Sequence, residues 1–472
     1  MRVERLSLAN FRGFEQIELS FEDDLTVIAG VNGVGKSAIL NAIAVLLSHT
    51  LREIAQSRAK PLLVGDGEIR EGQRVALASA QVRTNGQWID VSIQRTRPDP
   101  VTAEKARRDL DWLARLKAEA EGYPEHTPEF REKERYLRSL LTDAANEINV
   151  RLGDVPTETV RTGGLDAVHG SEVRIKDELR SRPNQPLAVF FSASRQLFKG
   201  VRTLPNATPL SVPAAFFGAL DGKSLNLGHF VRWYRVQERL GGGRRHKIVQ
   251  ELQRVVHDFI PEFKALRVEE KPTPRFVVEK NGVPLVLDQL SDGERGLLTI
   301  VFDLTRRLAI ANPERDDPIA DGRAIVLIDE IELHLHPQWQ RQVLRRFTET
   351  FKGCQFIVTT HSPQVIGEVE PRCLRFLIPE DDRIIAWTPP RSLGLDASRV
   401  LEELMDVRAR NAEIDTALHE LFELIEKEDF KTADQRIDAL AGKLGEDDVE
   451  LTRARSLITF LRGANEGDSK EP

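Results

Sequence analysis

Eight residues near the start of the chain have the types and spacing of a phosphate-binding loop. Residues 30–37 read G-V-N-G-V-G-K-S and fit the pattern G-x-x-x-x-G-K-[ST]. Glycine lets a backbone approach phosphates closely, and the N–H groups at a helix start attract anions. The lysine adds a point charge for the β- and γ-phosphates, and the serine hydroxyl is a hard ligand for Mg²⁺. The residues predicted to bind the nucleotide here are Asn32, Gly33, Gly35, Lys36 and Ser37.

Two adjacent carboxylates, Asp329 and Glu330, follow a short apolar run at residues 325–328. We expect Asp329 to hold Mg²⁺ together with Ser37, and Glu330 to orient and deprotonate the attacking water. The alternative is a pair of strand-end acids bound to surface lysine or arginine. That alternative leaves the apolar run before the acids unexplained, so the catalytic interpretation is preferred.

A third motif, L-S-D-G-E at residues 290–294, complements the first two. Ser291 Oγ and the Gly293 N–H can donate to a γ-phosphate, and the helix that follows adds a positive dipole. Taken alone, the pentapeptide is a capping box with serine at the N-cap and glutamate three residues later. Such a turn cannot easily reach the phosphates of its own subunit, so it predicts a site shared with a partner. His361 ends an apolar run and is predicted to contact the γ-phosphate as a catalytic group.

The elements around these residues have the strand–loop–helix order that a phosphate loop requires. Residues 25–29 form a β-branched apolar run, as in a buried central strand, and residues 38–47 should form the next helix. Asn85-Gly86 and Asn281-Gly282 join alternating runs and predict β-hairpins. Further strands are predicted at 187–191, 325–328 and 355–360, and helices at 248–260, 296–311 and 338–351.

Length and composition bound the class of protein. With 472 residues the chain exceeds one ordinary core, so a head with appended helical regions is expected. The net charge of −7 argues against a general coat for nucleic acid but leaves room for local basic patches. Without a long apolar run or a signal peptide, we expect a soluble cytoplasmic protein. Cys354 and Cys373 lie in apolar segments and are predicted to be buried thiols in a reducing compartment.

The four motifs together resemble the Walker A, signature, Walker B/D-loop and H-loop of ABC-type ATPases, in the branch of RecF, SMC and OLD proteins. The segment N-F-R-G-F at 10–14 resembles that branch's N-terminal strand motif, whose arginine lies near the nucleotide. This adds Arg12 to the nucleotide-binding candidates. The form I-D-E-I-E-L-H-L-H-P at 328–337 is similar to the small antiphage ATPases typified by PtuA of Septu systems and some retrons. The segment at 395–405 resembles the same group.

The resemblance implies an α/β fold, with an ABC-type, RecF/SMC-like P-loop ATPase head, a helical insertion and a helical C-terminal extension. It implies ATP and Mg²⁺ as cofactors and head-to-head dimerisation, with each signature turn closing the partner's ATP site. By position, Gln196 could be the Q-loop glutamine. The predicted domains are the N-terminal lobe with the P-loop at 1–100, the helical insertion at 101–186, the C-terminal lobe at 187–391, and a helical region with a disordered tail at 392–472.

A nuclease centre is missing from the pattern. OLD-type nucleases carry a Toprim domain with acidic residues on strands, whereas beyond His361 this chain has only Glu380-Asp381-Asp382 in a loop. We therefore predict no intrinsic nuclease, and the resemblance points to an HNH-type nuclease partner. The expected function is a slow or regulatory ATPase that scaffolds this nuclease in bacterial antiphage defence. The alternative is a RecF/SMC-like DNA-repair ATPase acting on DNA. A transporter ATPase is disfavoured by the L-S-D-G-E form.

Two smaller features remain open. His334 and His336 have a spacing that could suggest metal ligands, but no second pair of ligands accompanies them. The basic run at 244–247, near Trp233 and Tyr234, would either contact DNA phosphates or be a solvated loop beside core aromatics.

Overall fold

The computed structural model describes residues 1–97, 158–163, 176–194, 211–222, 227–239, 244–269, 275–381 and 383–468. The chain divides into two compact units, Met1–Leu395 and Asp396–Pro472. The phosphate loop, the signature turn, the two acids and His361 lie in the first, which we call the head unit. The second is called the helical unit.

A six-stranded sheet forms the centre of the head unit, in the order β14-β13-β3-β12-β11-β7. All of its strands except β14 run parallel, and β3, β12, β11 and β7 are buried along almost their whole length. Because Ile328 pairs with Val358, and Thr360 with Ala29, these strands end level with one another. The motifs that follow them therefore meet at one edge. The strands are β3 (Leu25–Gly30), β7 (Leu187–Phe191), β11 (Ala324–Ile328), β12 (Gln355–Thr360), β13 (Leu374–Glu380) and β14 (Arg383–Trp387).

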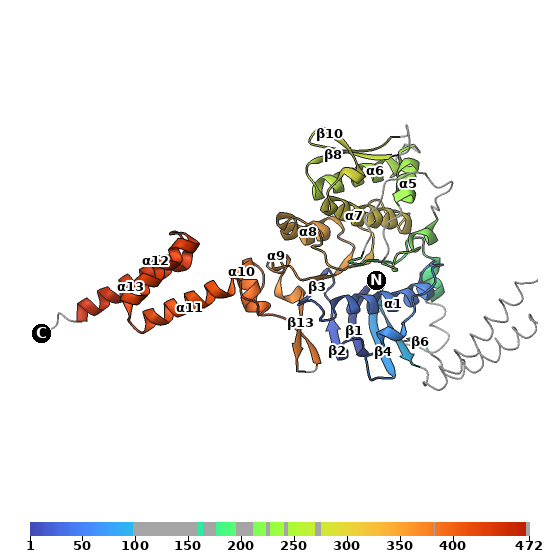
Figure 1. Cartoon of the computed structure of the whole chain (residues 1–472). Helices are drawn as coiled ribbons and strands as arrows, with labels where there is room; N and C mark the ends of the chain where they lie inside the picture. The colour runs from blue at the N-terminus through green and yellow to red at the C-terminus, as the bar shows by residue number, and fades with distance from the viewer. Residues whose placement is uncertain are drawn as a thin grey trace, which may run out of the picture. The chain divides into compact units, whose positions relative to one another are not determined.

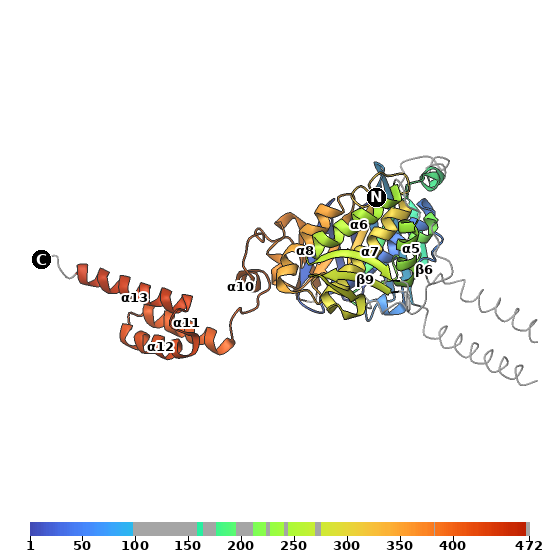
Figure 2. The same ribbon diagram turned by 90° about the horizontal axis from the view of Figure 1, so that it is seen from above.

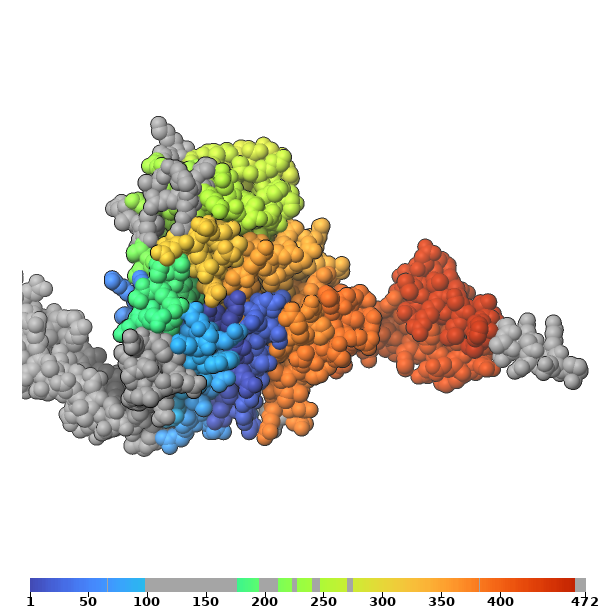
Figure 3. All heavy atoms as spheres, turned by 180° about the vertical axis from the view of Figure 1, so that it is seen from behind, coloured from blue at the N-terminus to red at the C-terminus, as the bar shows by residue number. Residues whose placement is uncertain are grey.

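A second, antiparallel sheet has the order β2-β1-β4-β5-β6. Helix α1 (Lys36–Ile54) contacts strands of both sheets, and β14 lies beside β2 (Figure 1). Figure 3 shows the β13–β14 hairpin in orange next to the dark blue strands of this sheet. The predicted hairpin at Asn85-Gly86 is confirmed, since Thr84 pairs with Gln87 and both turn residues have positive φ. The strands are β1 (Arg2–Phe11), β2 (Phe14–Ser20), β4 (Val75–Thr84), β5 (Gln87–Thr96) and β6 (Glu158–Gly163).

The predicted helical insertion is only partly covered by the described residues. Residues 98–157, which include its helix-like part, lie outside them. Strand β6 falls inside the predicted insertion and pairs with β5 instead, so this stretch belongs to the sheet. Its sequence, E-T-V-R-T-G, is rich in β-branched residues, which favour strands over helices.

A third sheet, β10-β9-β8, lies with helices α5 and α6 over α7, as Figure 2 shows from above. Phe230 stacks on Phe302 with ring centroids 4.3 Å apart, which joins α5 to α7. Trp233 and Tyr234 are fully buried, so they are core residues. The predicted hairpin at Asn281-Gly282 is confirmed. The elements are α5 (Leu227–Arg239), α6 (Arg244–Phe259), β8 (Phe263–Glu269), β9 (Arg275–Lys280), β10 (Val283–Val286) and α7 (Asp292–Ala311).

The remaining helices of the head unit are short or cover the central sheet. The α-helices are α8 (Pro337–Thr350) and α9 (Pro363–Ile366), and the 3₁₀ turns are η1 (Asp66–Glu68), η2 (Val212–Ala215), η3 (Leu287–Gln289) and η4 (Pro371–Cys373). Both cysteines are buried free thiols, as predicted, and burial raises the pKa of Cys354 to about 12. The α/β fold class is confirmed. In the part of the chain that the structure covers, no helix is long and apolar enough to span a membrane.

The helical unit is built from three main helices around a small apolar core. Leu421, Ile425 and Leu451 are fully buried in it. Asn411 and Asp429 cap two of the helices by accepting backbone N–H bonds. The elements are α10 (Ala397–Arg399), the π-helical turn η5 (Val400–Leu404), α11 (Ala412–Glu426), α12 (Phe430–Leu444) and α13 (Val449–Asp468).

Candidate nucleotide site

The phosphate loop connects β3 to α1, and three of its glycines have positive φ. A Cβ atom on Gly35 would lie 2.5 Å from Cζ of Phe14, and one on Gly30 would lie 2.8 Å from the Leu377 carbonyl oxygen. Gly33, in contrast, faces open space. The loop is therefore packed tightly on its protein side and open on the other, as a phosphate cradle requires.

Lys36 is buried and points back across the loop. Its Nζ donates to the carbonyl oxygens of Gly30 and Val31, at 2.8 and 2.9 Å. Burial lowers the pKa of Lys36, whereas the carboxylates of Glu332, Glu330 and Asp329 act in the opposite direction. The structure thus brings the lysine of the first motif close to the acids that follow β11.

Thr359, near the end of β12, fixes both predicted acids. Its hydroxyl donates to Asp329 Oδ1 at 2.6 Å, and the Glu330 backbone N–H donates to the same hydroxyl oxygen at 2.8 Å. Asp329 is buried, while Glu330 is partly exposed and has a φ of +47°. The left-handed conformation costs a non-glycine residue about 1 kcal/mol, and such strain is concentrated at functional sites. Sequence reasoning missed Thr359, although it stands two residues before His361.

Glu332 ties the segment after the acids to His361. Its Oε1 accepts a 2.7 Å hydrogen bond from the His361 backbone N–H and lies 3.0 Å from His361 Nδ1. Glu332 is only 5% exposed, and its Oε2 is buried without a hydrogen-bond partner among the described residues. A buried carboxylate oxygen in this position is normally completed by water or a ligand. Glu332 was not among the predicted site residues, because its side chain could not be placed from the sequence.

The signature turn starts helix α7 as a full capping box. Glu294 Oε2 accepts from both the Ser291 N–H and the Ser291 hydroxyl, each at 2.8 Å. Its other oxygen accepts from Lys280 Nζ at 2.6 Å. Burial acts to raise the pKa of Glu294, but Lys280 and Ser291 outweigh it, so the pKa is lowered. Glu294 is buried in this arrangement, and Ser291 stays exposed at the helix start.

Gly293 brings the signature turn against the segment after the acids. A Cβ atom on Gly293 would lie 2.4 Å from the His334 carbonyl oxygen, a contact that only glycine permits. His334 itself has a φ of +63°. The close approach of the His334 backbone therefore explains why this position requires glycine. The phosphate contacts predicted for Ser291 and Gly293 remain predictions.

The N-terminal strand motif contacts the phosphate loop through Phe14, which packs on Gly35. Arg12 instead forms an ion pair with Glu68, and its Nη2 donates to Glu68 Oε1 at 2.5 Å. The predicted contact between Arg12 and nucleotide stays a prediction.

The other candidates are placed as follows. Gln196 lies outside the described residues. His336 caps helix α8, because its Nδ1 accepts from the Gln338 N–H at 3.3 Å. Within the described ranges, no cluster of three or more His, Cys, Asp or Glu side chains could hold a metal.

The basic run at 244–247 begins helix α6, so the prediction of a loop at these residues is wrong.

Ser37 and Asp329 fit the predicted Mg²⁺ site. Ser37 lies in the first turn of α1, next to the buried Lys36. Asp329 directly follows β11 and accepts a hydrogen bond from Thr359 on the neighbouring strand β12. A hydroxyl and a carboxylate are the hard oxygen ligands that Mg²⁺ prefers.

Two family descriptions match the chain. Residues 5–146 match an "AAA domain" family. Residues 164–367 match the family described as "AAA domain, putative AbiEii toxin, Type IV TA system". Together they cover the phosphate loop, the signature turn, the acids and His361.

Three relatives extend the comparison. The chain is 28% identical to the "Retron Ec83 probable ATPase" of Escherichia coli, over 96% of this chain and 86% of that protein. It is 36% identical to the "Retron Vc95 probable ATPase" of Vibrio cholerae, over 34% and 30%. It is 39% identical to the "Septu protein PtuA" of Bacillus mycoides, over 16% and 10%. With the motif geometry, these matches support an ABC-type ATPase of the RecF/SMC/OLD branch.

Proposed function

We propose that the chain binds ATP with Mg²⁺, hydrolyses it in a head-to-head dimer, and controls a partner nuclease in bacterial antiphage defence. The observation that carries hydrolysis is the alignment of Asp329 and Glu330 by one threonine hydroxyl, close to Lys36. Adjacent carboxylates with different exposure suit different roles, one beside the metal and one beside water. The retron and Septu relatives support the setting in defence.

In this proposal the phosphates lie on the open side of the loop, against the N–H groups at the start of α1. Lys36 Nζ exchanges its two carbonyl acceptors for phosphate oxygens. Mg²⁺ bound by Ser37 and Asp329 would neutralise charge on the β- and γ-phosphates. Glu330 takes a proton from the attacking water, and His361, held by Glu332, donates to the γ-phosphate. ATP and water give ADP and phosphate.

The dimer is supported by the position of Ser291. It is exposed at the start of α7, and the neighbouring Gly293 packs on the backbone of His334. A partner head that meets the signature turn therefore also meets the loop after the catalytic acids. A site shared between two heads would therefore couple the binding of nucleotide to the formation of the dimer.

A separate nuclease is supported by the residues beyond His361. Glu380 ends β13, and Asp381 lies in the turn before β14, with a φ of +50°. Glu380 therefore stands at a strand end opposite Arg383, a cation, and not opposite a second carboxylate that could share a metal with it. The HNH type of the proposed partner comes from the resemblance to PtuA-like systems.

The test compares the purified wild-type chain with Glu330→Gln and with Glu368→Gln, which removes an exposed acid elsewhere in the head unit. Phosphate release should fall by at least about 100-fold in Glu330→Gln. Light scattering should show that this variant accumulates as a dimer when ATP is added. Glu368→Gln should behave as wild type.

Two results would contradict parts of the proposal. Unchanged hydrolysis in Glu330→Gln would remove the base assignment, and a strict monomer with bound ATP would remove the shared site. The partner is tested by co-purification with products of adjacent genes. An associated HNH nuclease supports the defence role, whereas association with replication proteins supports DNA repair instead.

A further inference from the structure

A cavity rich in arginine lies where the parallel strands of the six-stranded sheet begin, at the end opposite to the ATP site. Its volume is about 440 Å³. Asp23 precedes β3, Arg323 precedes β11 and Lys352 precedes β12, whereas the ATP site follows the same strands. A strand of six residues rises about 20 Å, so the two sites are separate. The cations that line the cavity are Arg2, Arg83, Arg315, Arg323 and Lys352.

Positive charge exceeds negative charge in this cavity. Its acids are Asp23 and Asp321. Arg83 is already neutralised, because it forms ion pairs with Asp23 at 2.6 Å and with Glu4 at 2.5 Å. The other four cations still outnumber the lining acids, so an anion would be attracted.

Arg2 carries the strongest sign of a missing ligand. Its Nη1 is buried without a hydrogen-bond partner among the described residues. Burial is the main cause that lowers the pKa of Arg2. Cys354 and Asp23 oppose this shift, and Arg323 and Arg83 add to it. An unpaired buried guanidinium atom costs free energy, and an anionic oxygen would recover it.

The walls of the cavity are fixed in advance. A Cβ atom on Gly353 would lie 2.3 Å from the Gly322 carbonyl oxygen, and the Gly353 N–H donates to Ala320 at 2.9 Å. The buried Gln355 side chain bonds both the N–H and the carbonyl of Val3, each at 2.8 Å. The segments that carry Arg2, Arg323 and Lys352 are thus held together, which lowers the entropy lost when a ligand binds.

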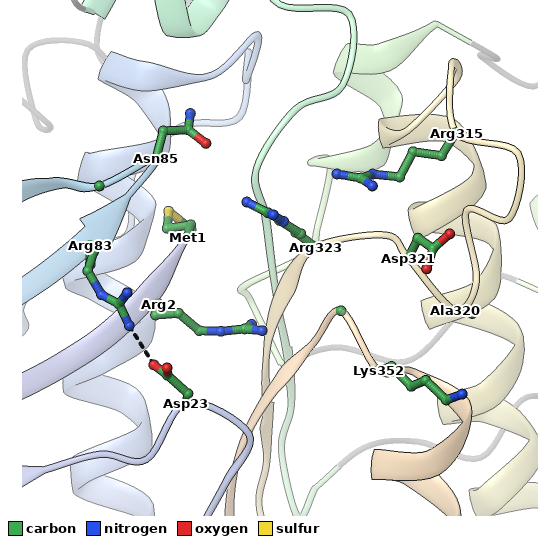
Figure 4. A pocket seen from close by; sticks show the side chains of 12 residues that line it. Met1, Arg2, Asp23, Arg83, Asn85, Arg315, Ala320, Asp321, Arg323 and Lys352 are labelled. Carbon is green, nitrogen blue, oxygen red and sulfur yellow. Dashed lines mark hydrogen bonds and ion pairs between the residues drawn. The ribbon is translucent and has the colours of Figure 1, made fainter.

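Figure 4 shows Arg2, from β1, and Arg315 and Arg323, from the connection between α7 and β11, reaching toward the middle of the cavity, while Lys352 points away. Guanidinium groups bind phosphate oxygens through paired hydrogen bonds. Approach from several directions suits a tetrahedral phosphate better than a planar carboxylate. The twelve described lining residues include no aromatic ring, so a base would not be stacked. We propose that this cavity is a second phosphate site, which binds a phosphate of a nucleic-acid strand or of a nucleotide.

The experiment uses the full chain and a fluorescent single-stranded DNA 12-mer with a 5′-phosphate, measured by anisotropy. Arg323→Glu should weaken binding at least about tenfold, as expected for a lost charged hydrogen bond. Arg345→Glu, which changes a 73% exposed arginine on α8, is the matched control and should stay within about twofold. Hydrolysis of ATP by Arg323→Glu should equal that of wild type, which also shows that it folds. Arg323→Gln provides a milder second variant.

Two further arms identify the source of the phosphate. Equal binding of the 5′-hydroxyl 12-mer, with no competition by AMP, assigns the site to the strand backbone. Full competition by AMP or pyrophosphate assigns it to a nucleotide or a terminal phosphate. The proposal is overturned if both Arg323 variants bind the 12-mer and AMP as wild type does, if wild type binds neither, or if an acidic peptide alone binds in an Arg323-dependent way.

Discussion

The parallel strands of the central sheet attract anions at both of their ends, which we call the two edges, but by different means. At the edge with the ATP site, the attraction comes from backbone N–H groups, a helix start and one lysine, opposite the carboxylates of Asp329 and Glu330. At the other edge it comes from basic side chains, mostly of arginine. The reason is topological, because helices that follow parallel strands present their N-termini at the carboxyl edge. An edge without helix starts must use side chains to bind an anion.

The buried cations at the two edges are also satisfied differently. Lys36 has two carbonyl acceptors and three nearby carboxylates. Arg2 has a buried nitrogen with no acceptor in the described part of the chain. The ATP site can therefore remain empty at little cost in free energy. The cavity around Arg2 would instead be stabilised by an anion.

The largest expected effect separates the two edges directly. Lys36→Ala removes a charged donor to the phosphates and should weaken ATP binding by about 10- to 100-fold. Binding of the phosphorylated 12-mer should stay within about twofold of wild type. Calorimetric titration with ATP and anisotropy with the 12-mer measure the two affinities on one preparation.

Arg323→Glu is the matched variant at the other edge and should give the reverse pattern. If Lys36→Ala also loses the 12-mer, the DNA is bound at the ATP site and the two edges are not independent.

The sequence predicted the loop and the strands at the ATP edge because their determinants are local. Residues 30–37 dictate a loop whatever surrounds them, and the run before Asp329 dictates a buried strand. Thr359 and Glu332 were missed because their roles depend on the register between β11 and β12. The arginine cavity could not be predicted at all. Its cations come from four separate segments, and nothing in their local sequence indicates that they meet.

The second effect concerns how the ATP edge orients His361. Glu332→Gln keeps the shape but weakens the acceptor for the His361 N–H, so kcat should fall about tenfold while ATP affinity changes little. Phosphate release over a range of ATP concentrations separates the two constants. His361→Ala combined with Glu332→Gln should be no worse than His361→Ala alone. Additive losses would mean that Glu332 acts independently of His361.

A third, smaller effect tests how the ATP edge uses glycine. Gly33 and Gly35 both have positive φ, so alanine pays a similar backbone strain of about 1 kcal/mol at each. Only Gly35 meets another side chain, since its Cβ would overlap Phe14. Gly35→Ala should therefore lower the free energy of unfolding by about 1–3 kcal/mol more than Gly33→Ala. Urea denaturation measures the difference, and Phe14→Leu should recover part of it. Equal losses would show that Phe14 does not limit this position.

The smallest expected effect is measured at acid pH, which protonates carboxylates but leaves arginine side chains charged. The pKa of Glu294 lies below its ordinary value of 4.5, so its charge stabilises the fold above that pH and this contribution is lost as the pH falls through the folded pKa. Lys280→Met removes the partner and should cost about 1 kcal/mol at pH 7. The difference in Tm from wild type should shrink as the pH falls below 4.5, because protonation then removes the ion pair in wild type too. Lys352→Met, at the arginine edge, should give a difference that does not vary with pH. A constant gap for Lys280→Met would mean that its ammonium does not act through Glu294.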